Sequence, residues 1–259
     1  MPPVALTIAG SDPSGGAGIQ ADLKTFHQFG VYGEAVLTLV TVQNTSFVSR
    51  IETLAADLVR QQVEAVLSDI PPAAAKTGAL GNLGVVEAIA DLAKSFLFPL
   101  VVDPVLVSKH GSRLLSPEAE DALKRKLLPH AFLATPNIPE AEALTGLAIT
   151  GETGMRESAK RLLDLGCRAV LVKGGHRSGS ALDVLVEHSG VTLFDGKRVN
   201  TRHTHGTGCT YSAAITAGLA LGHDLRQAVR RAKSFVQSAI ETAPGLGRGQ
   251  GPVNHFAPD

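Results

Sequence analysis

Five short runs of the sequence are almost entirely apolar, and segments with helical patterns separate them. The runs cover residues 4–10, 35–40, 100–105, 132–137 and 169–175. A strand with one face in solvent alternates apolar and polar residues, whereas a strand covered on both faces is apolar throughout. The runs therefore predict an α/β fold in which a mostly parallel sheet carries helices on both faces.

Apolar spacing, capping residues and glycine stops predict the helices around this sheet. The predicted helices cover residues 19–30, 58–69, 83–96, 116–128, about 208–221 and about 224–242. Residues 181–196 predict a hairpin that adds antiparallel strands at one edge of the sheet. Because the pattern contains no repeat or linker, we expect a single domain over residues 1–259.

The composition excludes several classes of partner. Lys plus Arg and Asp plus Glu both number 24, so the formal net charge is zero and a nucleic-acid partner is not expected. The longest apolar runs are far shorter than the roughly 20 residues of a membrane helix. Two cysteines without CxxC spacing, and no leader-like N-terminus, lead us to expect a cytoplasmic protein that does not insert into membranes.

Polar residues gather where the predicted strands end. They are the segment from Asp12 to Gly18, Gln43 with Asn44, Asp103, Asn137 and Lys173. In open α/β sheets, ligands bind beyond the carboxyl ends of the strands. The sequence therefore predicts a functional site at this edge of the sheet.

The segment HTHGTGCT, residues 203–210, joins a glycine loop to a predicted helix. Gly206, Thr207 and Gly208 offer backbone N–H groups at a helix start, which attracts anions. Cys209 lies at the same helix start, so we expect the helix dipole to lower the pKa of its thiol. The two histidines of this segment form an HxH pair, but no third ligand at a recognisable spacing supports zinc.

The first glycine-rich segment, AGSDPSGGAGIQAD, contains a formal GxGxxA pattern. It lies too far beyond the strand for a dinucleotide fingerprint, and the second strand ends on Gln43 and Asn44 where a ribose-binding acid is needed. Neither this segment nor GGHRSGSALD ends in the GK[ST] of a Walker A motif. The glycines can instead bring the backbone close to a small substrate, with Asp22 turned into a pocket; a solvated helix face is the alternative for Asp22.

Four further residues suit a phosphate bound with a metal ion. Asp103 follows a buried strand, and Asn137 and Glu140 flank a short helix start, where an amide and a carboxylate suit water-mediated Mg²⁺. Lys173 precedes two glycines and can neutralise phosphate charge. A turn start for Asp103, helix capping for Asn137 and a solvated position for Lys173 are the alternatives. Together with the Gly206 loop, these residues point to phosphoryl transfer.

Six segments of the sequence resemble one known family. They are LTIAGSDPSGGAGIQADLKTF, TVQNT, VVDPV, TPNIPEAE, VKGGH and THGTGCT, and the similarity continues to GPVNHF near the C-terminus. The family is the hydroxymethylpyrimidine kinase / phosphomethylpyrimidine kinase of thiamine biosynthesis, in the ribokinase-like superfamily. The resemblance implies a three-layer α/β/α sandwich. It also implies phosphorylation of 4-amino-5-hydroxymethyl-2-methylpyrimidine, and then of its monophosphate, with ATP and Mg²⁺.

The resemblance also implies roles for individual residues. Gly206 to Cys209 would form an anion hole, with Cys209 beside the incoming hydroxyl as a candidate general base. Lys173, Asn137 and Glu140 would form the nucleotide and metal side, with Asp103 as a helper on the metal side. The implied pyrimidine contacts are Ala17, Asp22, Gln43, Val105 and Cys209.

Three alternatives remain open at this stage. A pyridoxal or pyridoxine kinase is the closest, although the Gln43 amide suits an aminopyrimidine, because it both donates and accepts hydrogen bonds. A non-catalytic pyrimidine-phosphate sensor and a dehydrogenase are less consistent with the motifs. Ala79 stands where some relatives carry methionine, which predicts a looser pocket wall. The superfamily often forms homodimers, and no patch of this sequence argues for one independently.

Overall fold

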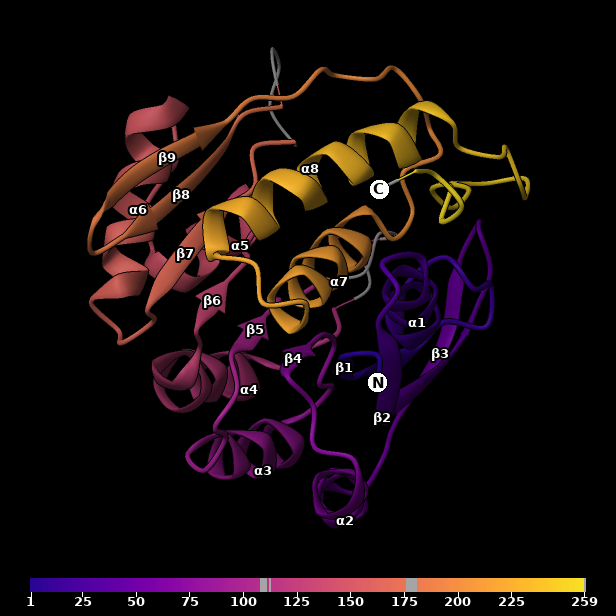
Figure 1. Cartoon of the computed structure of the whole chain (residues 1–259), viewed down its shortest axis with the longest axis vertical. Coiled ribbons are helices and arrows are strands. Elements are labelled where there is room, and N and C mark those ends of the chain that lie inside the picture. Colours follow the sequence, from indigo (N-terminus) through magenta and orange to yellow (C-terminus); the bar gives the residue numbers. More distant parts are fainter. Residues whose placement is uncertain (108–110, 112, 176–180, 259) are drawn as a thin grey trace.

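The structure is a computed structural model that describes residues 1–107, 111, 113–175 and 181–258 (Figure 1). Among these residues, nine strands form one sheet in the order β3-β2-β1-β4-β5-β6-β7-β8-β9. The strands are β1 (Val4–Ser11), β2 (Tyr32–Gln43), β3 (Val48–Thr53), β4 (Ala74–Thr77), β5 (Leu100–Val102), β6 (Leu133–Ala134), β7 (Ala169–Val172), β8 (Asp183–Glu187) and β9 (Gly190–Phe194).

The strand pairing confirms the predicted mostly parallel sheet. Strands β2, β1, β4, β5, β6 and β7 pair in parallel, and the predicted hairpin supplies antiparallel β8 and β9 at one edge. Strand β3 pairs antiparallel with β2, so the other edge is antiparallel as well, which the sequence analysis did not predict. It also missed β4, because this four-residue segment, with two alanines and Lys76, has only Thr77 as a residue that favours strands.

The helices are α1 (Gly18–Gln28), α2 (Ala56–Asp69), α3 (Leu83–Ala93), α4 (Pro117–Ala122), the π-helix η1 (Leu123–Leu127), the 3-10 helix η2 (Leu128–His130), α5 (Ile138–Thr145), α6 (Gly151–Leu163), α7 (Thr207–Ala220) and α8 (Leu225–Glu241). The predicted helix over 116–128 is therefore three consecutive helical pieces. Helix α6 was not predicted, because its first turn contains two glycines that weaken a helical pattern.

The helices cover the two faces of the sheet. Figure 1 shows α1, α7 and α8 on one face, with α2 to α6 on the other. Each face has its own apolar core, and neighbouring strand residues alternate between the two cores: Val102 packs with the α2 to α6 side, whereas Val101 packs with the α7 and α8 side. The predicted three-layer α/β/α arrangement is confirmed.

The strand order reverses at β1, which places the expected ligand edge. From β1 the sheet grows one way to β2 and β3, and the other way to β4 and onward. A crevice forms beyond the carboxyl ends of strands at such a switch point. The segment from Asp12 to Gly18 follows β1, and Gly78 follows β4, so both segments border this point.

Two further observations bear on the sequence predictions. No helix in the described ranges is both long and apolar enough to span a membrane. Residues 176–180 belong to the GGHRSGSALD segment tested above for a Walker A motif, and they lie outside the described residues.

Candidate active site

The loop after β1 is organised by one buried carboxylate, Asp12. Its oxygens accept hydrogen bonds from the backbone of Ser14 (2.8 Å), Gly16 (3.2 Å) and Ala17 (2.8 Å), and one oxygen lies 2.7 Å from Nε2 of His205. Burial alone would raise the pKa of Asp12, but the hydrogen bonds from His205 and Ser14 hold it well below its usual value. The glycine-rich loop is therefore shaped around an ionised Asp12.

His205 connects this loop to the second glycine loop. The pair His205–Asp12 spans the two segments, so the histidine of the HxH motif engages a carboxylate of the first loop. Gly206, the next residue, has a φ of 78°, and a Cβ on it would lie 1.7 Å from the backbone oxygen of Gly16. The two loops thus touch backbone to backbone, which only glycine at position 206 permits.

The residues predicted for the phosphate side meet at the start of α7. Nζ of Lys173 lies 2.9 Å from Oδ1 of Asp103, and Asp103 also accepts hydrogen bonds from Thr135 and Ser212. A Cβ on Gly208 would lie 3.5 Å from the Lys173 ammonium and 3.9 Å from Asp103 Oδ2. The ammonium and the first turn of α7 therefore face the same space. Lys173 is not a solvated surface lysine, since its side chain is 12% exposed.

Asn137 and Glu140 form a capping box at the start of α5. The Asn137 side chain accepts from the Glu140 backbone (2.9 Å), and the Glu140 carboxylate accepts from the Asn137 backbone (2.8 Å). The capping alternative is therefore correct for their geometry. Burial raises the pKa of Glu140 to about 7, against the favourable charge of Lys173, and the nearby Asp103 raises it further. A cation beside this carboxylate would stabilise its ionised form.

Asp22 lies on α1 and is fully buried, so a solvated position for this residue is excluded. Its two oxygens lie 2.8 and 2.9 Å from Nζ of Lys76, and the Thr7 hydroxyl donates to it at 2.7 Å. The sequence analysis missed Lys76, which is fully buried in β4. The available signal was a lysine inside an apolar run, because such a charge is buried only when it is paired.

Cys209 lies in the first turn of α7 and is partly buried. The expectation of a lowered pKa is wrong: burial raises the pKa of its thiol to about 11, and Asp22 and Asp103 add to this effect. The Lys76 charge and a hydrogen bond with the Gly18 backbone act in the opposite direction. Desolvation and two nearby carboxylates outweigh the helix dipole here, so the resting thiol is protonated at neutral pH.

The other predicted pyrimidine contacts are Ala17 and Gln43, which border the first glycine loop, and Val105, which lies near Asp103. Ala17 is the N-cap of α1 and donates its backbone N–H to Asp12. Gln43 ends β2, and its side chain contributes to the lowered pKa of Asp12. Val105 is half-buried just after Asp103 and donates its N–H to the Asp103 backbone at 2.9 Å.

The glycine-rich C-terminal segment folds back over this region. The His205 backbone donates to Gly251 (3.0 Å), and the Thr45 backbone accepts from Gln250 (2.7 Å). Further along, the ring of His255 lies 3.1 Å from the Thr210 hydroxyl of α7. The tail thus connects the turn after β2 to the start of α7.

The donor groups fit a metal ion held mainly by phosphates and water. No group of three or more His, Cys, Asp or Glu that could hold a metal occurs within the described ranges. Asp103 and Glu140 are the carboxylates beside Lys173, and Asp103 is already engaged by three hydrogen-bond donors. Two carboxylates of this kind suit Mg²⁺, which keeps much of its hydration shell.

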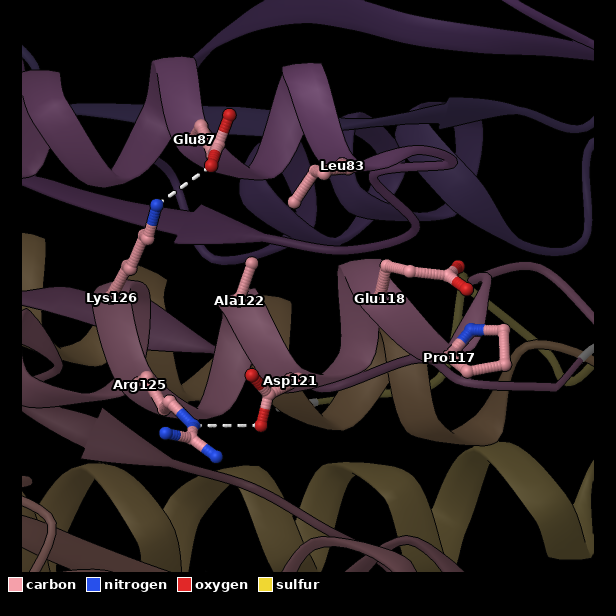
Figure 2. Close-up of a pocket in the computed structure, with 8 residues that line it drawn as sticks. All are labelled: Leu83, Glu87, Pro117, Glu118, Asp121, Ala122, Arg125 and Lys126. Atoms are coloured by element: carbon pink, nitrogen blue, oxygen red, sulfur yellow. Dashed lines mark hydrogen bonds and ion pairs between the residues drawn. The ribbon is translucent and has the colours of Figure 1, made fainter.

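A separate groove lies between α3 and α4, on the other face of the sheet from α7 (Figure 2). Two ion pairs occur in its wall, Glu87 with Lys126 at 2.7 Å and Asp121 with Arg125 at 2.8 Å. None of the predicted site residues lines it. The residues that line it are Leu83, Glu87, Pro117, Glu118, Asp121, Ala122, Arg125 and Lys126.

Known proteins resemble this chain over nearly its whole length. The sequence model of the phosphomethylpyrimidine kinase family matches residues 12–254. A hydroxymethylpyrimidine/phosphomethylpyrimidine kinase of Haemophilus influenzae is 48% identical, over 97% of this chain and 96% of the relative.

Two solved structures share the fold. A phosphomethylpyrimidine kinase from Clostridium difficile has a TM-score of 0.83 at 44% identity, and the match covers 92% of this chain and 99% of that one. The ADP complex of Bacillus subtilis pyridoxal kinase has a TM-score of 0.91 at 37% identity, covering 99% and 98%. The fold expected from the resemblance is thus confirmed. From the match to its sequence model and from these relatives, the chain belongs to the phosphomethylpyrimidine kinase family.

Proposed function

We propose that this protein transfers the γ-phosphoryl group of ATP to 4-amino-5-hydroxymethyl-2-methylpyrimidine and then to the resulting monophosphate, as a kinase of thiamine biosynthesis. One observation carries the proposal: Gly206 packs directly on Gly16. This contact supports the proposal because it brings the segment from Asp12 to Gly18 against the Gly206 loop at the start of α7. An acceptor hydroxyl and a phosphate bound there would be neighbours, as in-line transfer requires.

On the phosphate side, the first backbone amides of α7 and the Lys173 ammonium offer positive charge to the γ-phosphate. Asp103 orients the ammonium through their 2.9 Å ion pair. ATP as the donor is supported by the ADP complex of the related pyridoxal kinase. Mg²⁺, held through water near Glu140 and Asp103, would neutralise phosphate charge when bound.

On the acceptor side, Gln43 would donate to and accept from the aminopyrimidine edge, with Ala17 and Val105 beside it. Asp22, which is fully buried, would act through its ion pair with Lys76. Cys209 would lie beside the hydroxymethyl group. Because the resting thiol has a pKa of about 11, its chief role at neutral pH would be to orient the hydroxyl. Only the thiolate form of Cys209 could accept the hydroxyl proton, and in a loose transition state that transfer from oxygen to sulfur would occur late.

A pyridoxal or pyridoxine kinase is the second candidate, and the similarity to pyridoxal kinase favours it specifically. Both rings carry a hydroxymethyl group. Ala79 is half-buried beside the turn after β4, and its small side chain is compatible with a wider ring. The Gln43 amide is the feature that favours the aminopyrimidine.

A ³¹P NMR time course with Mg²⁺-ATP and either ring tests the proposal. We expect a monophosphate and then a diphosphate from the pyrimidine, with pyridoxine phosphorylated slowly. Fast conversion of pyridoxine alone would identify a vitamin B6 kinase and refute the assignment of Gln43. Binding of the pyrimidine phosphate without any turnover would indicate a sensor instead.

A further inference from the structure

A buried carboxylate, Asp183, lies beside the nucleotide side of the site and has no part in the mechanism above. It begins β8 and is 2% exposed. Oδ1 accepts from the Gly174 backbone at 2.9 Å, and Oδ2 accepts from the Tyr211 hydroxyl at 3.0 Å and from Lys233 Nζ at 2.6 Å. The donors come from the segment after β7, from α7 and from α8, so this one side chain joins three parts of the fold.

Gly174 gives this contact its importance for the nucleotide. It follows Lys173 directly, and a Cβ on it would lie 1.9 Å from the Leu182 backbone oxygen. The chain after Lys173 is therefore pressed against the start of β8, and Asp183 holds its amide there. By holding the Gly174 amide, Asp183 also fixes the backbone position from which the Lys173 side chain extends.

Tyr211 links the same carboxylate to the phosphate loop. It lies two residues after Cys209 in α7 and is buried. Burial and the adjacent Asp183 raise the pKa of the Tyr211 phenol well above its usual value. The phenol therefore stays protonated and donates to Asp183, which ties the first turns of α7 to the backbone at Lys173.

Lys233 of α8 supplies the countercharge. Its ammonium also donates to the backbone oxygen of Ala181 at 2.5 Å. A buried carboxylate with one cation and two neutral donors is fully satisfied and therefore rigid.

We propose that Asp183 is a positioning residue for the nucleotide: through Gly174 and Tyr211 it sets the Lys173 ammonium against the first turn of α7. The proposal rests on the proposed function, since it assigns the nucleotide to Lys173. Three of the proposed pyrimidine contacts, Ala17, Asp22 and Gln43, belong to α1, its N-cap and β2 rather than to the segments that Asp183 joins. Loss of Asp183 should therefore weaken nucleotide binding and leave the acceptor site intact.

The test compares Asp183→Asn and Tyr211→Phe with the unmodified protein by ADP calorimetry and by the KM values for ATP and for the pyrimidine. We expect Asp183→Asn to weaken ADP binding and raise the KM for ATP by about tenfold or more. Tyr211→Phe, which loses one hydrogen bond, should change both by about threefold. The KM for the pyrimidine should stay within about twofold in both variants.

Asp195→Asn is the matched control. Asp195 lies at the end of the same hairpin and also accepts from a glycine amide, that of Gly196 at 3.0 Å, but it is exposed. It should behave like the unmodified protein. Equal ADP binding in folded Asp183→Asn, or an equal rise of both KM values, would overturn the proposal.

Two other results are interpretable. If Asp183→Asn does not fold, Tyr211→Phe decides, because it retains the Asp183–Lys233 pair; unchanged ADP affinity in Tyr211→Phe would then overturn the proposal. If the unmodified protein neither binds ADP nor phosphorylates either ring, the proposed function itself fails. That outcome is distinct from a failure of the Asp183 assignment.

Discussion

At the scale of single residues, Cys209 shows how burial can outweigh a helix dipole. If its sulfur takes the hydroxyl proton, Cys209→Ser should lower kcat by about 10²- to 10⁴-fold. The pKa of about 11 also predicts the direction of the pH dependence. Because the thiolate fraction grows as the pH approaches that value, kcat of the unmodified protein should rise between pH 7 and 9.5, and kcat of Cys209→Ser should not. Steady-state assays with pyrimidine over this range measure both effects.

Cys167→Ser is the control for this experiment. Cys167 is buried in the core, and its thiol donates to the Leu128 backbone oxygen at 3.3 Å, a bond that serine can keep. Its kcat should match that of the unmodified protein. A loss below roughly tenfold in Cys209→Ser would leave Cys209 as a contact only.

The buried pair Asp22–Lys76 makes a prediction about stability. Lys76→Met removes the cation and leaves the Asp22 carboxylate buried without its countercharge, which should lower the free energy of unfolding by about 3 to 5 kcal/mol. The double variant Asp22→Leu/Lys76→Met removes both charges and should recover most of this loss. Urea unfolding of the two variants measures the difference; equal stability of single and double variants would contradict the account.

At the scale of elements, the two glycine loops depend on close backbone approach. Gly206→Ala places a Cβ 1.7 Å from a backbone oxygen, so the loops must separate and kcat should fall by about 10²-fold. Gly222→Ala is the matched control, because Gly222 also has a positive φ, 82°, but open space around its Cβ position. Both variants should lose about 1 kcal/mol from backbone strain. Equal kcat in the two variants would show that the loop contact is dispensable.

The C-terminal tail packs a buried histidine, His255, against α7. We expect this residue to make the stability of the fold fall in acid. Burial lowers the pKa of His255 to about 4, with smaller effects from Lys24 and His205. Between pH 6.5 and 4 the unfolded chain binds the extra proton and the folded chain does not, so stability falls as the pH falls. This group should cost about 2 to 3 kcal/mol from pH 7 to 4.5.

Unfolding titrations at several pH values check this prediction. His255→Gln should reduce the acid-dependent loss by that amount, whereas the same change at the exposed His188 should not. An identical pH dependence in His255→Gln and the unmodified protein would rule out the tail as the sensitive element.

At the scale of the whole molecule, one continuous sheet with a core on each face leads us to infer a single domain. The apolar runs predicted the central strands, because a strand buried on both faces has no other composition available. Strands β3 and β4, which the sequence analysis did not predict, are not continuous apolar runs. Strand β3 contains only exposed and half-buried positions at the sheet edge, and β4 consists of small residues around a paired lysine.

The sequence by itself determined the layered fold, the edge at which the polar residues gather and the family to which the chain belongs, because these follow from periodicity and from motifs local in the chain. Only the tertiary structure decided which charges meet. Lys76 pairs with Asp22, His205 with Asp12 and Lys233 with Asp183, and these pairs are separated by 54, 193 and 50 residues in the sequence. It also reversed the expected pKa of Cys209, since desolvation depends on neighbours that no local pattern specifies.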